Sequence, residues 1–484
     1  MMIIDQEKLV DNIIISDIIR VYPELKKLIE TCSPYEVRGK ILSVLDPRND
    51  LHYDYKEFHE LNLECEELKY LDEIAVTLRN YVRVADTEVK SFGEVMTPIP
   101  LVEDMLDTLP KEVWSNKDLK WFDPCAGVGT FPSIVVQRLM KGLKKVIPNK
   151  NKRYRHIIEN MIYVCELQAK NMFIFHCIFD RPNIFEMNTY CGSFLTDEFN
   201  KHMSNVWGVE KFDIVIGNPP YNTGTSGGNG SRDLWDKFVF KGYDLMIDGG
   251  FLLYVHPSKW RSPENKIFDL FKKNNLIYLE IHSKQDGKKV FGATTRYDFY
   301  LLQKSNYGGN TKIIDELGNE ININICEWNW LPNYNFDLIK TILNGDEKCE
   351  VIYSRTIYGN DKNWMSVEKN ELNYLPCVYG MYKDGTHSYK YSSIDKGHFG
   401  ISKVIVSGGE VPYPYNDNEG KFGIMNNAFA LKINSNEEGE EIKKAMNSKK
   451  FSQILKATKW SNFQINYKMF KSFRKDFYKQ FLND

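Results

Sequence analysis

Short apolar runs alternate with longer amphipathic stretches between residues 89 and 308. The runs read LKWFDPCAG, IYVCE, FDIVIGNPPY, GGFLLYVHP, LIYLEIHS and YDFYLLQK. Strands that are apolar throughout and separated by helices are typical of a largely parallel sheet, buried on both faces. We therefore expect an α/β domain here. In such a sheet ligands bind where the carboxyl ends of the strands open into a crevice.

The rest of the chain lacks this pattern. With 484 residues, the chain exceeds what one hydrophobic core holds, which predicts two or three domains. Residues 1–88 carry apolar residues at helical spacing. A polar, turn-rich stretch at 304–312 ends the α/β region, and mixed short strands and loops follow. We place the boundaries of three parts at 1–88, 89–308 and 309–484.

The composition argues against a disulfide-linked protein, a zinc protein, a membrane protein and a metal-dependent nuclease. The nine cysteines are scattered without CxxC spacing, which favours free thiols in a reducing cytoplasm over disulfides or a zinc site. No run approaches about 18 apolar residues, so no membrane segment is expected. Asp46, Asp50 and Glu57 fit a solvated loop better than a nuclease metal site, and no metal is predicted. The net charge of −2 leaves any basic surface local.

The stretch WFDPCAGVGTFPSIVVQRL reads as a strand, a glycine turn and a helix. Gly127 and Gly129 allow a tight turn, and the helix start offers free N–H groups. The third glycine of a dinucleotide fingerprint is absent, and Asp123 begins the turn. A second strand ends at Glu166, where an acid can accept both ribose hydroxyls. This combination favours S-adenosylmethionine over a dinucleotide.

A further strand, FDIVIG, runs directly into Asn218-Pro219-Pro220-Tyr221. Proline is expected at strand ends and not inside central strands. The Asn218 side-chain oxygen and the Pro219 carbonyl can accept hydrogen bonds from one exocyclic amino group, and the Tyr221 ring can lie against a planar base. Two acceptors favour a tetrahedral nitrogen that can attack a sulfonium methyl group. The motif therefore indicates methyl transfer to an amino or amide nitrogen, by positioning and electrostatics.

The chain resembles the amino-methyltransferases that modify DNA at exocyclic nitrogens, and most closely the gamma-type adenine N6 methyltransferases, including those of restriction–modification systems. The family order is present in GEVMTPIPLVEDML, DPCAGVGT and GNPPYN, followed by a large domain. The resemblance covers residues 89–308. It implies a Rossmann-like S-adenosylmethionine-dependent methyltransferase domain with a mostly parallel sheet, an N-terminal helical region and a C-terminal α+β target-recognition domain.

The resemblance also implies roles for residues that match the family motifs. Thr97 and Pro98 match the segment that holds the methionine end of the cofactor, and Glu166 matches the ribose-binding acid. Cofactor contacts are also implied for the turn and for the catalytic asparagine: Asp123, Cys125, Ala126, Gly127, Gly129, Thr130 and Asn218. Cys125 and Ala126 stand in swapped order compared with the commoner Ala-Cys.

The third-strand motif departs from the family. Ser193, followed by Phe194, stands where the family usually has an acid that contacts the cofactor's adenine. Asp197 or Glu198 could replace that acid, and the sequence does not choose between them. Two further motifs are similar to the family's later ones. They place Pro257 at a strand end near the target base and make Phe291 the candidate aromatic for packing on it.

Two segments could contact DNA. The glycine-rich stretch 222–235 is either a plain connection or a loop that helps hold an extruded adenine. Residues 441–484 contain 11 Lys/Arg and 3 Asp/Glu, interleaved with aromatics. A basic helical face of this kind suits phosphate contacts. Loops 353–365 and 405–422 could read base edges, but nothing in them specifies a sequence.

The leading hypothesis is a site-specific DNA adenine N6 methyltransferase that acts on a flipped-out base in double-stranded DNA. The alternatives are a protein glutamine N5 methyltransferase, which shares the Asn-Pro-Pro-Tyr motif, and an RNA adenine methyltransferase. About 175 residues follow the catalytic core, and this favours DNA. If the chain serves a restriction system, we expect the restriction endonuclease to be a separate chain.

Overall fold

A computed structural model describes residues 97–179, 185–221, 234–306, 308–460 and 464–483. The predicted N-terminal helical region lies outside these residues, as does most of the glycine-rich stretch 222–235. The chain divides into two compact units. The first runs to Pro257 and also contains Lys273–Glu280 and Lys284–Lys312. The second contains Ser258–Lys272, Ile281–Ser283 and Ile313–Asp484.

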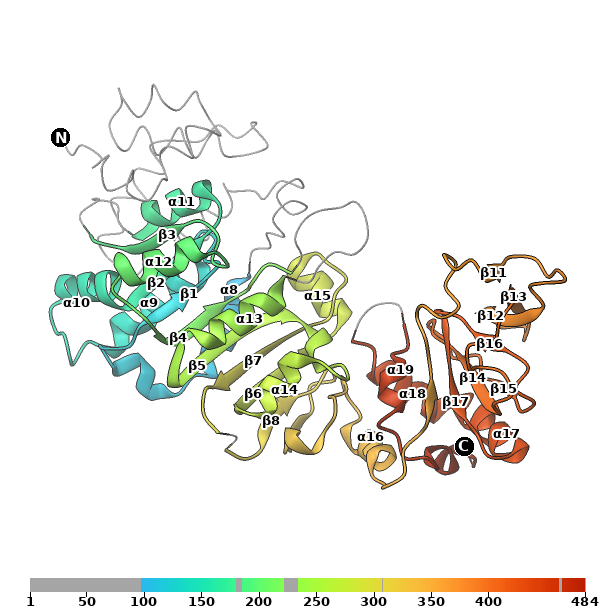
Figure 1. The fold of residues 1–484 in the computed structure, drawn as a ribbon. Coiled ribbons are helices and arrows are strands. Elements are labelled where there is room, and N and C mark those ends of the chain that lie inside the picture. Colours follow the sequence, from blue (N-terminus) through green and yellow to red (C-terminus); the bar gives the residue numbers. More distant parts are fainter. Residues whose placement is uncertain (1–96, 180–184, 222–233, 307, 461–463, 484) are drawn as a thin grey trace. The chain divides into compact units, whose positions relative to one another are not determined.

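Seven strands of the first unit form a sheet in the order β3-β2-β1-β4-β5-β7-β6 (Figure 1). They are β1 (Trp121–Asp123), β2 (Ile162–Glu166), β3 (Asn188–Cys191), β4 (Phe212–Gly217), β5 (Met246–Pro257), β6 (Asn275–His282) and β7 (Tyr297–Gln303). The pairings of β1 with β2, β1 with β4, β2 with β3 and β4 with β5 are parallel, whereas β7 pairs antiparallel with β5. The strand order reverses between β1 and β4, which is where an open α/β sheet binds its ligand.

Helices pack on both faces of this sheet. They are α8 (Ile99–Asp107), α9 (Thr130–Gly142), α10 (Lys150–His156), α11 (Ala169–Phe179), α12 (Asp197–Asn205), α13 (Trp235–Asp244) and α15 (Lys284–Phe291). Apolar residues of α8, α9 and α11 share one core cluster with Trp121 of β1. The next residue, Phe122, points to the opposite face, where its ring packs against Phe199 of α12. Alternate residues of a strand face opposite sides, so both faces of β1 are buried.

The second unit combines two small sheets with helices. The sheets take the orders β10-β17-β14-β15 and β11-β13-β12-β16. The strands are β10 (Val351–Ile352), β11 (Met365–Ser366), β12 (Leu375–Met381), β13 (His387–Ser392), β14 (Lys403–Ser407), β15 (Tyr415–Asp417), β16 (Gly423–Ile424) and β17 (Ala428–Lys432). The helices are α14 (Lys266–Lys272), α16 (Phe336–Leu343), α17 (Asn436–Met446), α18 (Lys449–Ala457) and α19 (Tyr467–Phe470). The strands β8 (Thr311–Ile314) and β9 (Glu320–Ile323) precede α16 along the chain.

The predicted fold class is confirmed. The first unit has a mostly parallel sheet with helices on both faces, and an α+β unit contains most of the chain that follows it. Within the described residues, no helix combines the length and the apolar character needed to span a bilayer.

Candidate active site

Asp123 lies at the carboxyl end of β1, at the centre of the sheet. Its side chain is 2% exposed, and its Oδ1 accepts a hydrogen bond from the Cys125 backbone N–H at 3.0 Å. Its Oδ2 is buried without a hydrogen-bond partner among the residues that the structure describes. Burial raises the pKa of this carboxyl to about 8, and the nearby Glu166 carboxylate also raises it. A buried acid with a free oxygen is prepared to accept a hydrogen bond from a ligand.

Glu166, at the end of β2, fastens the glycine turn. Its Oε2 accepts from the Gly127 N–H at 2.9 Å, and its Oε1 accepts from the Gln168 N–H at 2.8 Å. Gly129 closes the turn with φ of 95° and precedes the first residue of α9, Thr130. The ribose-binding role stays a prediction, because the carboxylate already accepts these two backbone hydrogen bonds and retains lone pairs for more.

Asn218 follows the last residue of β4 and contacts the segment that begins the described chain. Its Nδ2 donates to the Oγ1 of Thr97 at 3.1 Å, and Thr97 is buried. This bond joins two motifs that lie 121 residues apart, with the amide nitrogen as the donor. The Asn218 Oδ1 then lies buried without a partner in the described part of the chain. It is the acceptor that the sequence assigns to an exocyclic amino group.

Gly217 is a site residue to which the sequence analysis gave no role. Its φ is 148°, and a Cβ added there would lie 2.9 Å from the Oδ1 of Asp123. Only glycine lets the end of β4 approach the carboxylate at the end of β1 this closely. A glycine at a strand end, directly before the Asn-Pro-Pro-Tyr motif, was the available signal.

Ring contacts connect Tyr221 with Phe291, the predicted base-packing residue. Its ring meets that of Phe291 edge to face, with centroids 6.3 Å apart, and Phe291 in turn contacts Tyr297 at 4.9 Å. Pro257, at the end of β5, is paired across the sheet with Tyr297. The Tyr221 hydroxyl is buried without a described partner, and burial raises its pKa, so the phenol stays neutral. The structure thus groups Tyr221, Phe291 and Pro257 around Tyr297.

The remaining predicted site residues lie in the loop after β3 and in the first turn of α12, and they differ in burial. Ser193 is half-buried, and its Oγ accepts from the Leu195 N–H at 3.3 Å. The Phe194 ring is 2% exposed and packs on Phe122 and Phe238, which is a core position. Asp197 and Glu198 are exposed in the first turn of α12. The core therefore uses the Phe194 ring, and neither acid is buried as a ligand-contacting carboxylate would be.

The orphaned polar atoms define what a ligand must bring. Among them are the Asp123 Oδ2 and the Asn218 Oδ1, which can accept hydrogen bonds, and the Tyr221 hydroxyl. Buried acceptors without donors are costly, so ligand N–H groups should fill them. S-adenosylmethionine carries an ammonium group that fits Asp123, and adenine carries an amino group that fits Asn218. In the described part of the chain, no group of three or more His, Cys, Asp or Glu side chains could hold a metal ion.

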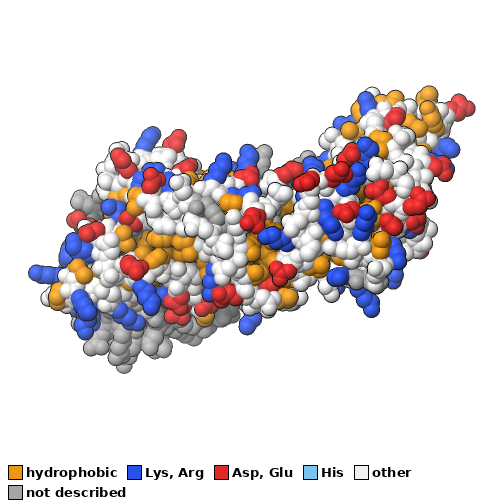
Figure 2. All heavy atoms as spheres, turned by 90° about the horizontal axis from the view of Figure 1, so that it is seen from below, with side chains coloured by type: hydrophobic (Ala, Val, Ile, Leu, Met, Phe, Trp, Pro, Cys, Tyr) orange, Lys and Arg blue, Asp and Glu red, His pale blue; other side chains and the backbone are white. Residues whose placement is uncertain are grey.

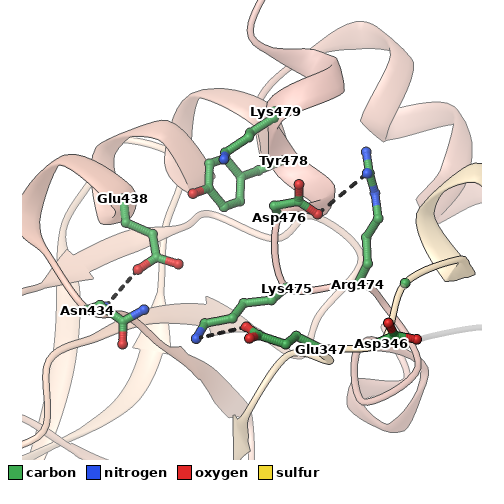
Figure 3. A pocket seen from close by; sticks show the side chains of 10 residues that line it. Asp346, Glu347, Asn434, Glu438, Arg474, Lys475, Asp476, Tyr478 and Lys479 are labelled. Carbon is green, nitrogen blue, oxygen red and sulfur yellow. Dashed lines mark hydrogen bonds and ion pairs between the residues drawn. The ribbon is translucent and has the colours of Figure 1, made fainter.

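The cations of residues 441–484 are largely paired with acids. At least six of the eleven form a salt bridge: Lys443, Lys459, Lys468, Lys471, Arg474 and Lys475. Figure 3 shows two of these pairs, Arg474–Asp476 and Lys475–Glu347, at a hollow of about 470 Å³. On the face drawn in Figure 2, Lys and Arg side chains are interspersed with Asp and Glu. The phosphate-contacting role predicted for this stretch stays a prediction, with fewer free cations than the sequence suggests.

Comparison with known proteins shows which family part of the chain resembles. Residues 139–291 match the family model of the Eco57I restriction-modification methylases. The match covers less than half of the chain and shows what this stretch is similar to. The matched stretch contains Glu166, Asn218 and Tyr221, although it begins after the glycine turn. The resemblance to restriction–modification methyltransferases that the motifs predicted is thereby confirmed.

Individual relatives are more distant. An uncharacterised adenine-specific methylase from Mycoplasma pneumoniae is 27% identical over 351 residues, which are 57% of this chain and 82% of that protein. A modification subunit of a putative type I restriction enzyme from Vibrio vulnificus shows 15% identity and a TM-score of 0.36, with 55% of this chain and 54% of that one covered. The DrdV–DNA complex shows 11% identity and a TM-score of 0.46, with 97% and 71% covered. The chain thus spans about half of the Vibrio subunit's length, and neither structural likeness bears on the site.

Proposed function

We propose that this chain is a site-specific DNA methyltransferase that transfers a methyl group from S-adenosylmethionine to N6 of a flipped-out adenine. The observation that carries the proposal is the buried, unpartnered Oδ1 of Asn218, held in place by Thr97 at the carboxyl end of β4. The methylase family of residues 139–291 supports the same reaction class. The proposed partners are double-stranded DNA and a separate restriction endonuclease.

The chain's own residues would act by positioning. The lone pair of an exocyclic amino nitrogen is delocalised into the base, so this nitrogen is a poor nucleophile. Acceptance of its hydrogens by the Asn218 Oδ1 and the Pro219 carbonyl favours a tetrahedral nitrogen with an available lone pair. When bound, S-adenosylmethionine supplies the electrophilic methyl group. Tyr221 contributes a neutral aromatic face, since burial keeps its phenol protonated.

Cofactor binding would rest on the turn around Asp123. The carboxylate oxygen that lacks a partner faces a ligand donor, and Glu166 and Gly127 keep the turn in shape through the 2.9 Å hydrogen bond. A ligand ammonium would favour the ionised form of Asp123, whose pKa is otherwise raised by burial. Thr97 would help indirectly, because it orients the Asn218 amide.

The glutamine alternative uses the same acceptor geometry, and the site alone does not separate the two substrates. The matched family is one of restriction-modification methylases, which favours DNA. RNA adenine would meet the same acceptors, so the substrate itself has to be tested.

The decisive experiment expresses the protein in a host that lacks adenine methylation and sequences the host DNA for modified bases. We expect a recurrent motif that contains N6-methyladenine, and we expect Asn218→Ala to abolish it. Asn205→Ala, at the exposed end of α12, is the matched control and should retain the modification. Unmodified DNA together with a methyl-labelled protein or RNA fraction would instead support an alternative.

Cofactor binding is tested separately by calorimetry with S-adenosylmethionine. Asp123→Ala should weaken binding by at least about tenfold, equivalent to about 1.4 kcal/mol. Asp118→Ala is the matched control, because the side chain of Asp118 is 74% exposed. Equal affinity in both variants would refute the assignment of Asp123.

A further inference from the structure

Lys241, in the last turn of α13, directs its ammonium group at the loop between β3 and α12. Its Nζ lies 2.6 Å from the Phe194 carbonyl oxygen and 3.2 Å from the Thr196 carbonyl oxygen. The same atom lies 4.9 Å from the centroid of the Phe194 ring and 5.1 Å from that of Phe199. No salt bridge to Lys241 occurs among the described residues. Its charge is balanced by carbonyl dipoles, by ring faces and, at longer range, by the Asp197 carboxylate.

Partial burial of the Lys241 ammonium costs free energy, which its contacts in this position have to offset. An ammonium is strongly hydrated, and burial lowers the pKa of Lys241. In return, two donated hydrogen bonds set the orientation of two peptide planes in a loop of only five residues, 192–196. Hydrogen bonds from a charged donor are stronger than neutral ones. Lys241 therefore holds this loop by hydrogen bonds from α13, alongside the Phe238 ring, which packs on Phe194.

The loop lies at the edge where the ligand crevice is expected. It leaves the carboxyl end of β3, and the Gly192 N–H donates to the Glu166 carbonyl at 2.8 Å. Inside the loop, the Thr196 N–H donates to the Ser193 carbonyl at 3.3 Å. The loop is thus fastened to β2 at its start and to α13 at its end. Between these anchors it presents Ser193, which stands in place of an acid.

The same helix begins beside the catalytic motif. The Leu234 N–H, one residue before α13, donates to the Tyr221 carbonyl at 3.1 Å. The ring of Trp235, the first residue of α13, is stacked on buried His256 of β5 at 4.4 Å. α13 is therefore held at its start against the base-binding motif, and it holds the loop after β3 from its last turn.

We propose that Lys241 is a positioning residue of the cofactor site. By holding the Phe194 and Thr196 carbonyls, it fixes loop 192–196 in the shape that receives the adenine end of S-adenosylmethionine. This compensates for the weaker hydrogen bonding of Ser193. The inference rests on the proposed function, because it takes S-adenosylmethionine as the cofactor. It adds a residue outside the family motifs and a direct role for α13.

The test compares Lys241→Met with Lys237→Met, an exposed lysine on the same helix. Calorimetry should show a dissociation constant for S-adenosylmethionine that is about tenfold higher in Lys241→Met and unchanged in Lys237→Met. 5′-Methylthioadenosine, which lacks the amino-acid end, should lose affinity by the same factor. At saturating cofactor, kcat should stay within about twofold of wild type. Lys241→Arg, which can still donate to both carbonyls, should recover most of the affinity.

The outcomes separate the two proposals. If wild type binds no S-adenosylmethionine, the proposed function fails and this inference fails with it. If wild type and Lys241→Met bind it equally well, the inference alone is overturned. A loss of S-adenosylmethionine affinity without a loss for 5′-methylthioadenosine also overturns it, because the adenine end would not be involved. Should Lys241→Met not fold, Lys241→Gln takes its place, because it removes the charge and keeps a shorter polar side chain: weaker binding of both ligands supports the role, and wild-type affinity for both contradicts it.

Discussion

Substitution of Gly217 by alanine tests how closely the ends of β1 and β4 must approach. An added Cβ would lie 2.9 Å from the Asp123 Oδ1 and 3.4 Å from the Cys125 Sγ, on a backbone with φ of 148°. A non-glycine residue in such a region costs about 1–3 kcal/mol. Displacing Asp123 would also weaken its hydrogen bond from the Cys125 N–H, worth about 1 kcal/mol. We therefore expect Gly217→Ala to lower the free energy of unfolding by about 2–4 kcal/mol.

The matched control is Gly208→Ala, where φ is 63° but nothing lies within 4 Å of the added Cβ. It isolates the backbone strain, which costs about 1–2 kcal/mol. Urea unfolding followed by tryptophan fluorescence measures both variants, and calorimetry measures S-adenosylmethionine binding. Gly217→Ala should also lose at least about tenfold in affinity, or about 1.4 kcal/mol, because Asp123 moves. Equal destabilisation in the two variants with unchanged affinity for Gly217→Ala would refute the reasoning.

Three further perturbations follow from the same structure. Gly129→Ala places a Cβ 2.7 Å from the Phe179 ring, whereas nothing lies within 4 Å of a Cβ added at Gly127, and φ is positive at both sites. In thermal unfolding, Gly129→Ala should therefore lower the melting temperature more than Gly127→Ala does. Burial raises the pKa of Asp123 to about 8, so the contribution of this carboxyl to folding stability is full below about pH 4 and is lost as the pH rises towards 8. Asp123→Asn should therefore reduce the pH dependence of the free energy of unfolding between pH 5 and 8, measured by urea unfolding. Lys403→Met leaves Asp417 buried without its 2.8 Å ion pair, which should cost about 3–5 kcal/mol in chemical denaturation, and a cost near zero would contradict this account.

Much of the first unit could be predicted from local sequence. Apolar strands separated by amphipathic stretches predict a parallel sheet, and the observed pairing of β1 with β4 places Asp123 and Asn218 at neighbouring strand ends. The motif residues Thr97 and Asn218 do meet, through the 3.1 Å hydrogen bond. The sheet and the motif positions could be predicted because each is specified by a few adjacent residues and by one general rule of α/β sheets. The Thr97–Asn218 contact itself was not predicted.

The remaining features depend on partners that local sequence does not reveal. Gly217 matters because a carboxylate from β1 lies beside it, and Lys241 matters because two carbonyls of another loop face it. Phe194 has a motif position, yet its ring is used by the core. In each case tertiary packing decides between a structural and a ligand-facing use of the same side chain.

The ion pairs of residues 441–484 would affect how strongly DNA binding depends on salt concentration. Glu264 holds both Lys468 and Lys471, more than 200 positions away along the chain. A lysine already neutralised by a carboxylate displaces fewer counterions from a phosphate than a free one does. A plot of the logarithm of the DNA-binding constant against the logarithm of the salt concentration should therefore have a shallower slope than eleven unpaired cations would give. The slope should become steeper when Glu264 is replaced by glutamine.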